Sequence, residues 1–447
     1  MIVDFERVLD RLNARAAENN IVPSLDRISA LVELLGDPHR AYDVVHVAGT
    51  NGKTTTSRMI ESLLAATGLH IGLTTSPHLH DVRERIRIHG QSVGMETFIE
   101  LCDEIEVIAE LVEARDDSAK ISYFEFLTAV AFAAFAAAPV DAAVIEVGLG
   151  GDWDSTNVVQ PTVSVITPIG LDHMDMLGDT IEEIAAVKAG IIKPNSIVVV
   201  GKQDPRALEV ILNRAAEVGA AALVAERDFG IIDRQLAVGG QVVTLRGLGG
   251  IYEDLVIPLH GQHQAENASL ALAAAEAFFG AGVDGKRLDD DVVRDGLGAV
   301  TSPGRLEVIR RGPTVLVDVA HNPHGMQSLV SAINEEFAFT HVVVILGVFA
   351  DKDVAGIVDV IEPIASHVIA TQSSSPRAMP AAELGALIAE VCTSAHTETQ
   401  VSLADALARA IEIADDLGAA EDGGVGILVT GSVVTVAQAR ALLGKRS

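Results

Sequence analysis

The sequence predicts an α/β protein with two domains, each built around a mostly parallel sheet that is covered by helices. Apolar runs of strand length alternate with helical patterns along almost the whole chain, which is typical of parallel sheets. A Gly-containing turn joins a strand to a helix near residue 50, and a Pro-Gly break at 301–304 separates two blocks of alternation. We therefore expect a first domain over 1–300 and a second, Rossmann-like domain over 301–447.

The first domain contains five strand-like runs and a larger number of helical patterns. The runs are 42–47, 70–75, 141–147, 162–167 and 196–200, and the helical stretches among them are 53–66, 95–112, 122–138, 180–189 and 205–218. Between about 221 and 257 the runs become short and glycines frequent, which predicts a small antiparallel appendage. Helical patterns at 264–280 and 286–296 complete this domain.

A second alternation follows the break at Thr301-Ser-Pro-Gly304. Its strands are expected at 314–319, 341–347, 367–371 and 426–430, and its helices at 324–337, 353–362, 381–392, 403–418 and 432–443. Ligands of such sheets bind at the carboxyl ends of the strands. The first strand here ends in Asp318-Val-Ala-His-Asn-Pro-His324, so this segment is a candidate ligand-binding segment.

Composition narrows the possible functions. The net charge of −30 disfavours a nucleic-acid partner or an anionic membrane surface. The N-terminus lacks the basic start and apolar core of a signal peptide, and the apolar stretch 126–138 is too short to span a membrane. Cys102 and Cys392 lie far apart, as expected of free thiols in a reducing compartment. We expect a cytoplasmic protein that acts on small molecules.

The segment Gly49-Thr-Asn-Gly-Lys-Thr-Thr55 carries the strongest chemical signal. It follows the apolar run 42–47 and opens a helical stretch. In this arrangement backbone N–H groups and the helix N-terminus face an anion, and a lysine neutralises phosphates. The pattern G-x-x-x-x-G-K-[ST] would need glycine at position 47, where valine stands, so this is a shortened P-loop. We interpret it as a nucleoside-triphosphate site centred on Lys53.

Polar side chains follow three other predicted strands of the first domain. Ser76 follows 70–75, Glu146 lies at the end of 141–147, and His173 lies just past 162–167. Because parallel strands bring their carboxyl ends to one edge, these groups can converge with Lys53. Oxygen and imidazole ligands beside triphosphate oxygens suit Mg²⁺. Each residue alone has a structural alternative as a turn, cap or packing residue, but their occurrence at equivalent strand ends favours a site.

Eight short segments also occur in a fixed order along the chain. They are G-T-N-G-K-T-T (49–55), T-S-P-H-L (75–79), R-E-R-I-R (83–87), E-V-G-L-G-G (146–151), L-D-H (171–173), K-A-G-I-I (188–192), S-P-G-R (302–305) and D-V-A-H-N-P-H (318–324). Together they resemble the folylpolyglutamate synthase/dihydrofolate synthase family of the Mur ligase superfamily. The resemblance runs from about residue 24 to Thr430-Gly-Ser432.

The resemblance implies an ATP-dependent amide ligase. The carboxylate of dihydropteroate or of a reduced folate attacks the γ-phosphate, and the amine of L-glutamate then displaces phosphate from the acyl phosphate. The cofactors implied are ATP as co-substrate and two Mg²⁺ ions, and the protein is expected to be a monomer. The sequence does not distinguish dihydrofolate synthase from folylpolyglutamate synthase activity, and it does not define the preferred folate or the polyglutamate length.

The resemblance also assigns roles to residues by position. The catalytic residues are Lys53, His321 and Lys188, whose side chain is expected to be carbamylated and to help hold the second Mg²⁺. The ATP contacts are Gly49, Thr50, Asn51, Gly52, Lys53, Thr54, Thr55, Asn267, Arg305 and Asp318. The Mg²⁺ ligands are Ser76, Glu146, His173 and Thr55. The substrate contacts are Leu25, Asp26, Arg27, Ser122, Tyr123, Phe124, Glu125, Trp153, Asp154 and Asn322. From the residues alone, Asn267 equally fits the cap of a helix over 268–279, and a surface lysine on the helix 180–189 is the favoured interpretation of Lys188.

One departure and two alternatives stay open. Asp152 stands where the resembling family usually has arginine, so it is expected to repel a substrate carboxylate by a few kcal/mol if the charges are unscreened. The alternatives are a Mur-type ligase acting on a UDP-linked muropeptide and an inactive ATP-binding homologue. Mur-type ligases carry a further N-terminal domain before the P-loop, whereas 48 residues precede Gly49 here.

Overall fold

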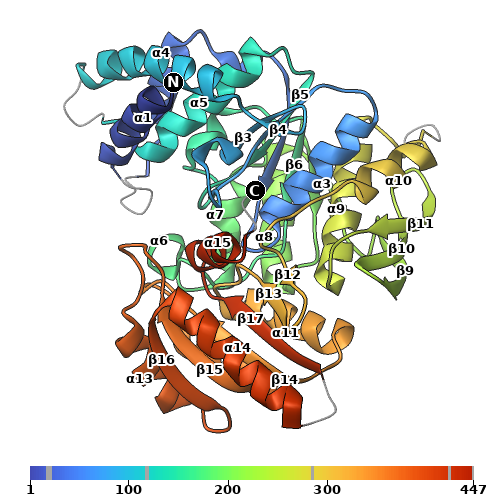
Figure 1. Cartoon of the computed structure of the whole chain (residues 1–447). Coiled ribbons are helices and arrows are strands. Elements are labelled where there is room, and N and C mark those ends of the chain that lie inside the picture. The colour runs from blue at the N-terminus through green and yellow to red at the C-terminus, as the bar shows by residue number, and fades with distance from the viewer. Residues whose placement is uncertain (17–22, 116–119, 283–285, 421–423, 445–447) are drawn as a thin grey trace. The chain divides into compact units, whose positions relative to one another are not determined.

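The computed structural model describes residues 1–16, 23–115, 120–282, 286–420 and 424–444 (Figure 1). The chain separates into two compact units. The first unit comprises Met1–Arg234, Val242–Ile257 and Ala265–Val300, and the second comprises Gln235–Gln241, Pro258–Gln264 and Thr301–Ser447.

An eight-stranded sheet forms the centre of the first unit, in the order β4-β3-β2-β5-β1-β6-β7-β8. The strands from β2 to β8 pair in parallel, and β3 and β4 add an antiparallel edge. Because β1 lies between β5 and β6, the loops after these three strands lie at one edge of the sheet. The strands are β1 Asp43–Ala48, β2 Ile71–Thr74, β3 Ile86–Ile88, β4 Gln91–Ser92, β5 Ala142–Glu146, β6 Val163–Ile166, β7 Ile197–Val200 and β8 Ala221–Val224.

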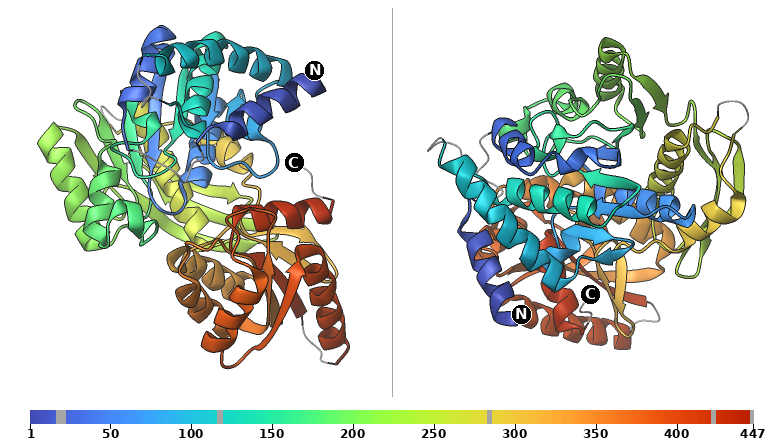
Figure 2. Two further views of the ribbon diagram at one scale, coloured as in Figure 1. Left: turned by 90° about the vertical axis from the view of Figure 1, so that its left-hand side faces the viewer. Right: turned by 90° about the horizontal axis from the view of Figure 1, so that it is seen from above.

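Helices cover both faces of this sheet (Figures 1 and 2). On one face, Ala143 and Ile145 pack with α5, and Ile166 and Val198 pack with α7 and α8. The α-helices of this part are α1 Ile2–Ala14, α2 Asp26–Leu34, α3 Lys53–Ala66, α4 Met95–Glu113, α5 Tyr123–Ala137, α6 Met174–Leu177, α7 Ile181–Ala189, α8 Pro205–Val218, α9 Gln262–Phe278 and α10 Asp290–Gly298. Three 3₁₀ helices accompany them: η1 Pro38–Arg40, η2 Val82–Arg85 and η3 Ser155–Val158.

A three-stranded sheet follows β8, with the order β11-β10-β9. Its strands are β9 Gly230–Ala237, β10 Gly240–Arg246 and β11 Ile251–Ile257. The sequence predicts that this appendage begins near residue 221. The structure differs, because 221–224 pairs in parallel with β7 and so extends the large sheet. The helix expected at 286–296 begins at Asp290, since the Asp289 carboxylate accepts the Asp291 N–H as an N-cap.

The second unit contains a six-stranded sheet in the order β12-β13-β17-β14-β15-β16. All pairs are parallel except β12 with β13. The strands are β12 Glu307–Arg310, β13 Thr314–Val317, β14 Phe339–Leu346, β15 Ala365–Gln372, β16 His396–Ser402 and β17 Gly424–Thr430. The helices are α11 Pro323–Glu336, α12 Val354–Ile361, η4 Glu362–Ile364, α13 Ala381–Val391, α14 Leu403–Ala420 and α15 Val433–Leu442. Val344, Val368 and Leu428 form its core with Leu329 of α11 and Ile357 of α12.

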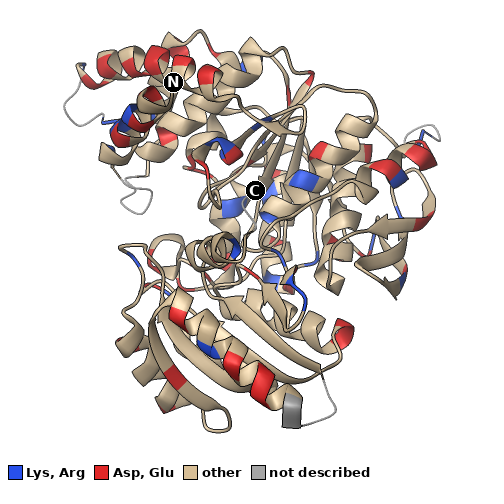
Figure 3. Ribbon diagram, viewed as in Figure 1, with Lys and Arg blue, Asp and Glu red and all other residues tan. Residues whose placement is uncertain are grey.

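The α/β class and the two mostly parallel sheets confirm the fold class that the sequence predicts. The domain boundary at residue 300 stays a prediction; two short segments before it, 235–241 and 258–264, group with the second unit. Acidic residues lie along α4, α10 and α14 (Figure 3). None of the described helices is long and apolar enough to cross a membrane.

Candidate active site

The P-loop adopts the strand–turn–helix geometry that its sequence predicts. It follows β1, and α3 begins at Lys53 after Gly52, whose φ of +85° is unfavourable for a residue with a side chain. A Cβ atom at Gly52 would lie 2.6 Å from Oδ1 of Asn267. The Lys53 ammonium donates hydrogen bonds to the carbonyl oxygens of Gly49 (3.1 Å) and Thr50 (3.3 Å), so it is held over the loop.

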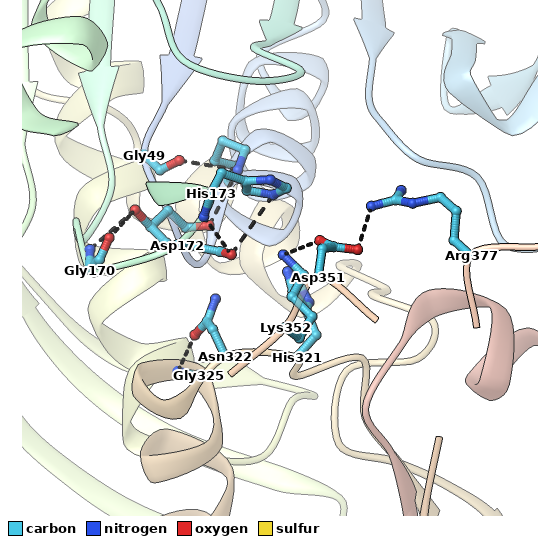
Figure 4. Close-up of polar contacts among 12 residues, drawn as sticks. Gly49, Gly170, Asp172, His173, His321, Asn322, Gly325, Asp351, Lys352 and Arg377 are labelled. Atoms are coloured by element: carbon cyan, nitrogen blue, oxygen red, sulfur yellow. Dashed lines mark hydrogen bonds and ion pairs between the residues drawn. The ribbon is translucent and has the colours of Figure 1, made fainter. Parts of the chain in front are cut away.

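The loop after β6 supports the P-loop from the neighbouring strand. The Pro168 carbonyl accepts the N–H groups of Thr50 (3.0 Å) and Asn51 (3.2 Å). The Thr50 hydroxyl lies 3.1 Å from both the N–H and the carbonyl oxygen of Gly170. A Cβ atom at Gly49 would lie 1.9 Å from the Thr167 hydroxyl, so only glycine fits there. Gly49 and Gly170 are labelled in Figure 4.

Glu146 lies at the end of β5 with 2% of its surface exposed. Its two oxygens accept hydrogen bonds from the segments that follow both neighbouring strands. Oε1 accepts the Thr54 hydroxyl at 2.8 Å, and Oε2 accepts the Ser76 N–H at 3.3 Å. Ser76, Glu146 and the P-loop are therefore brought together as the strand order predicts. The P-loop hydroxyl on this carboxylate belongs to Thr54, while Thr55 is buried in α3.

His173 lies at the end of the same supporting loop, with a left-handed backbone (φ +51°) that starts α6. Its N–H donates to the Asp172 carboxylate at 3.0 Å, and its Nε2 lies 3.9 Å from that carboxylate (Figure 4). Among the described residues, no three His, Cys, Asp or Glu side chains form a metal-binding cluster. A Mg²⁺ ion that takes most of its ligands from phosphates and water requires fewer protein groups than such a cluster.

Lys188 is a buried amine of this region. It lies in the last turn of α7 with 3% of its surface exposed. Burial, assisted by the positive charge of Lys53, lowers the pKa of the Lys188 amine from 10.5 to about 7, and the carboxylates of Asp172 and Asp154 oppose this shift. A large fraction of the amine is therefore neutral near pH 7. The interpretation of Lys188 as a surface lysine is wrong.

The predicted substrate segments meet one another in the first unit. The Arg27 guanidinium donates to the buried Glu125 carboxylate at 2.9 Å, which joins α2 to the start of α5. The same carboxylate accepts the Ser122 N–H at 2.8 Å in a capping box. The Phe124 ring lies against Gly148, where a Cβ atom would be 2.5 Å from the ring. Leu25 caps α2, and Asp26 begins it beside Ser24.

Arg85 links this region to the Ser76 loop. Its Nε donates to His78 Nδ1 at 2.9 Å, and its guanidinium lies 5.4 Å from the centre of the Tyr123 ring. The three segments 76–78, 83–87 and 122–125 are therefore neighbours in space. Arg85 and His78 are not among the site residues that the sequence predicts, although the motif at 83–87 points to this segment.

The loop after Glu146 carries Asp152, Trp153 and Asp154. The buried Asp154 carboxylate accepts the N–H groups of Leu149 and Thr156, both at 2.9 Å, and the Thr156 hydroxyl at 2.5 Å. Burial raises the pKa of Asp154. Asp152 is exposed as a whole residue, but partial desolvation of its carboxylate raises the pKa, and hydrogen bonds from backbone N–H groups, followed by the charge of Lys193, oppose that shift. The Trp153 ring packs on Gly150.

In the second unit, Asp318 organises the predicted segment after β13. Its buried carboxylate accepts the N–H groups of Leu306 (2.8 Å) and Ala320 (2.7 Å). Burial raises its pKa, and the positive charge of Arg305 opposes that shift. The His321 Nδ1–H donates to the Val319 carbonyl at 2.9 Å. Asn322 caps α11 by accepting the Gly325 N–H at 2.8 Å (Figure 4).

Two further cations lie at the same edge of the second sheet. Lys352 follows β14 and Arg377 follows β15, and both contact Asp351, at 3.6 and 3.0 Å (Figure 4). The Arg377 guanidinium also stacks 4.6 Å from the centre of the Phe349 ring. Because β13, β14 and β15 are parallel members of one sheet, these cations share the carboxyl edge that carries Asp318. Sequence reasoning missed them, although each follows a predicted strand.

Comparison with known proteins identifies the family. Residues 47–275 match the Mur ligase middle domain, and residues 304–433 match the Mur ligase glutamate ligase domain. The chain belongs to the Mur ligase family. It is 45% identical to the dihydrofolate synthase/folylpolyglutamate synthase of Mycobacterium tuberculosis, over 99% of this chain and 94% of that protein. The protein of the same name from Escherichia coli is 34% identical, over 94% and 92% of the two chains.

Solved structures agree with the sequence relatives. The M. tuberculosis folylpolyglutamate synthase complexed with ADP and AMPPCP superimposes with a TM-score of 0.95 at 46% identity, covering 100% of this chain and 99% of the other. A complex of FPGS with AMPPCP and folate gives a TM-score of 0.86 at 31% identity, covering 98% and 99%. This Mur ligase is therefore an ATP-dependent ligase of the dihydrofolate synthase/folylpolyglutamate synthase group.

Asn267 shows where a sequence alternative is wrong. It does not cap a helix that begins at 268, because α9 begins at Gln262 and contains Asn267 within it. Its buried side chain packs directly against Gly52 of the P-loop. The roles assigned to these residues stay predictions. Within the first unit, the contacts described above link the P-loop to Glu146, Ser76 and the segment 122–125.

Proposed function

We propose that this Mur ligase adds L-glutamate to dihydropteroate, to reduced folates, or to both, through an acyl-phosphate intermediate. The names of its relatives support both activities, and a folate complex of one structural relative supports the substrate class. The single observation that carries the proposal is the juxtaposition, in the first unit, of the P-loop with a buried carboxylate, Glu146, that contacts both Thr54 and Ser76.

The P-loop would hold the triphosphate of ATP. The N-terminus of α3 presents backbone N–H groups and the positive end of the helix dipole to the phosphates. The Lys53 ammonium, now bound to the Gly49 and Thr50 carbonyls, would move to the β- and γ-phosphates. The buried Asn267 would help to keep the loop in place through its contact with Gly52.

The donors beside the P-loop fit Mg²⁺. Glu146 offers carboxylate oxygens and Thr54 a hydroxyl in direct contact with it, and Ser76 and His173 follow neighbouring strands. Mg²⁺ prefers such oxygen donors, and it would neutralise phosphate charge during transfer. Thr54 is the better P-loop candidate for this role than Thr55, since its hydroxyl already contacts Glu146.

Lys188 fits the expected carbamate. A neutral amine attacks CO₂ to form an N–C bond and loses one proton, which converts the lysine into an anionic oxygen ligand. The lowered pKa of Lys188 supplies the neutral amine near pH 7. The carbamate would be charge-compensated by Lys53 and by a second Mg²⁺. A surface lysine with a pKa near 10.4 would be almost fully protonated and unreactive at that pH.

The reaction then needs two bond exchanges. An oxygen of the substrate carboxylate attacks the γ-phosphorus, and ADP leaves. The neutral amine of glutamate next attacks the acyl carbon, loses a proton, and expels phosphate as the tetrahedral intermediate collapses. Enzymes lower the barriers to such steps mainly by positioning the reactants and by stabilising charge. His321 and Asn322 are proposed to act on the phosphate or on the incoming glutamate.

The cations of the second unit suit the carboxylates of glutamate. Lys352 and Arg377 share one acidic partner, Asp351, so together the three groups carry one net positive charge. Arg377 presents a planar donor array that matches a carboxylate. We therefore propose Arg377 and Lys352 as glutamate-binding residues. A monomeric state and a cytoplasmic location remain predictions.

The test is an assay of glutamate incorporation with three acceptors in parallel. Dihydropteroate, tetrahydrofolate and a UDP-linked muropeptide are each incubated with ATP, Mg²⁺ and labelled L-glutamate. We expect incorporation with one or both pteridine acceptors, none with the muropeptide, and a loss of several orders of magnitude in folded Lys53→Ala. Incorporation only into the muropeptide, or ATP binding without ligation of any acceptor, would replace the proposal by one of the two alternatives.

A further inference from the structure

One peptide group beneath the P-loop is hydrogen-bonded on both of its sides. The carbonyl of Pro168 accepts the N–H groups of Thr50 (3.0 Å) and Asn51 (3.2 Å). The N–H group of the same peptide bond belongs to Ile169, and it donates to the side-chain oxygen of Gln203 at 3.0 Å. The peptide thus lies between the P-loop and the side chain of Gln203.

Gln203 makes a second contact with the same loop. Its side-chain NH₂ group donates to the Thr167 carbonyl at 3.0 Å, and it lies 3.5 Å from the Ile166 carbonyl. The Gly201 N–H also donates to the Ile166 carbonyl, at 2.9 Å. The Gln203 side-chain amide therefore takes the place of a backbone amide and extends the hydrogen bonding between β6 and β7 beyond Gly201.

Because of the geometry of the peptide bond, the contact with Gln203 also orients the carbonyl that binds the P-loop. A trans peptide is planar, and its N–H and C=O point in opposite directions, so fixing one direction fixes the other. We propose that Gln203 is a positioning residue for the P-loop. By holding the Ile169 N–H, it turns the Pro168 carbonyl toward the N–H groups of Thr50 and Asn51.

The consequence concerns the nucleotide, and to that extent it rests on the proposed function. The triphosphate is expected to bind to a loop whose backbone is already ordered, because ordering it at the moment of binding costs free energy. The supporting loop also carries His173 at its far end. Gln203 therefore acts on ATP through the loop 167–173, without touching the nucleotide itself.

The test substitutes methionine, which has a similar length and neither donor nor acceptor of comparable strength. In Gln203→Met the Ile169 N–H and the Thr167 carbonyl lose their partner, and the 168–169 peptide can rotate. We expect amide hydrogen exchange at Thr50 and Asn51 to accelerate about three- to tenfold, in line with the loss of a hydrogen bond. The dissociation constant for AMPPCP should rise by a similar factor, while the KM for glutamate stays unchanged.

Gln160 provides a matched control. It is also a glutamine of the first unit whose side-chain NH₂ donates to a loop carbonyl, that of Pro194 at 3.2 Å. Gln160→Met should leave exchange at Thr50 and Asn51, and AMPPCP binding, within twofold of the unaltered chain. Gln203→Asn, whose amide is one methylene too short to reach both groups, serves as the second variant and should change exchange in the same direction.

The exchange measurement is made without nucleotide, so it separates this inference from the proposed function. Unchanged exchange at Thr50 and Asn51 in folded Gln203→Met or Gln203→Asn would overturn the positioning role. Equal acceleration in Gln160→Met would overturn it as well, since the effect would then be a general loss of stability. Failure of the unaltered chain to bind AMPPCP would contradict the proposed function, and the exchange result would still decide the role of Gln203.

Discussion

Replacing Lys188 by methionine measures what it costs to keep an amine inside this protein. Lys188 is 3% exposed, and burial with the nearby charge of Lys53 lowers its pKa from 10.5 to about 7. Each pKa unit corresponds to about 1.4 kcal/mol, so this interval corresponds to about 5 kcal/mol between the two protonation states. Methionine has a similar length and no titratable group, so the stability of the variant lacks this pH-dependent contribution.

The sign follows from proton counting. The unfolded chain binds the Lys188 proton below about pH 10.5, whereas the folded protein binds it only below about pH 7. Between these values the unfolded state holds more protons, so the free energy of unfolding rises with pH. The stability gained by having Lys188 neutral is fully present above pH 10.5 and is lost as the pH falls to about 7. From pH 7 to pH 9, the unaltered chain should gain about 2–3 kcal/mol relative to Lys188→Met.

Urea unfolding at pH 7, 8 and 9 in chelator-containing, CO₂-free buffer measures this difference. Trp153, the single tryptophan of the chain, reports on the first unit by fluorescence because it lies in the loop that packs against α7 near Lys188. A stability difference between the two proteins that does not change with pH would refute the reasoning. Labelled bicarbonate should then give a carbamate NMR signal in the unaltered chain alone, and ligation should be lost in the variant.

Three further substitutions test separate parts of the site. Thr54→Val should raise the Mg²⁺ concentration needed for half-maximal activity about tenfold, because it loses a hydrogen bond to a charged group. Thr56→Val should leave that concentration unchanged, because it removes a buried hydroxyl of the same helix that has no hydrogen-bond partner among the described residues. Equal effects of the two substitutions would contradict the role of Glu146. Arg377→Ala should raise the KM for glutamate at least tenfold in steady-state kinetics without changing the KM for ATP. A raised KM for ATP with an unchanged KM for glutamate would contradict the proposed glutamate-binding role of Arg377. Asp152→Arg should lower the KM for the folate substrate about fivefold, as a screened charge contact worth on the order of 1 kcal/mol allows; an unchanged KM with a lower Tm would show that Asp152 acts only locally.

The edge of the first sheet could be predicted because its chemistry follows strand order. Ser76 directly follows an apolar run, Glu146 lies at the end of one, and Lys53 closes the turn after a third. Parallel pairing brings such positions to one edge of the sheet. The choice between neighbouring hydroxyls could not be predicted. Thr54 and Thr55 differ by about 100° around α3, and only the start of the helix at Lys53 determines which of them faces Glu146.

Contacts made by the backbone left no pattern in the sequence. Pro168 supports the P-loop through its carbonyl, and Gln203 bonds to a peptide group. Because the partners are backbone groups, neither contact requires a particular side chain at the partner position, so the sequence does not reveal them. From the sequence alone a surface lysine is the favoured interpretation of Lys188, and its burial depends on the close approach of Gly151 to α7. Lys352 and Arg377 follow predicted strands of the second block, so the rule about strand ends applies to them as it does to Asp318.

Transfer of ¹⁸O tests the central claim most directly. The acceptor that supports ligation is labelled with ¹⁸O in its reacting carboxylate and incubated with the full-length protein, ATP, Mg²⁺ and L-glutamate. If the carboxylate attacks the γ-phosphorus and phosphate later leaves the acyl carbon, each amide bond formed should deliver one ¹⁸O atom to inorganic phosphate. Phosphate without label, or label found in AMP, would contradict the acyl-phosphate mechanism.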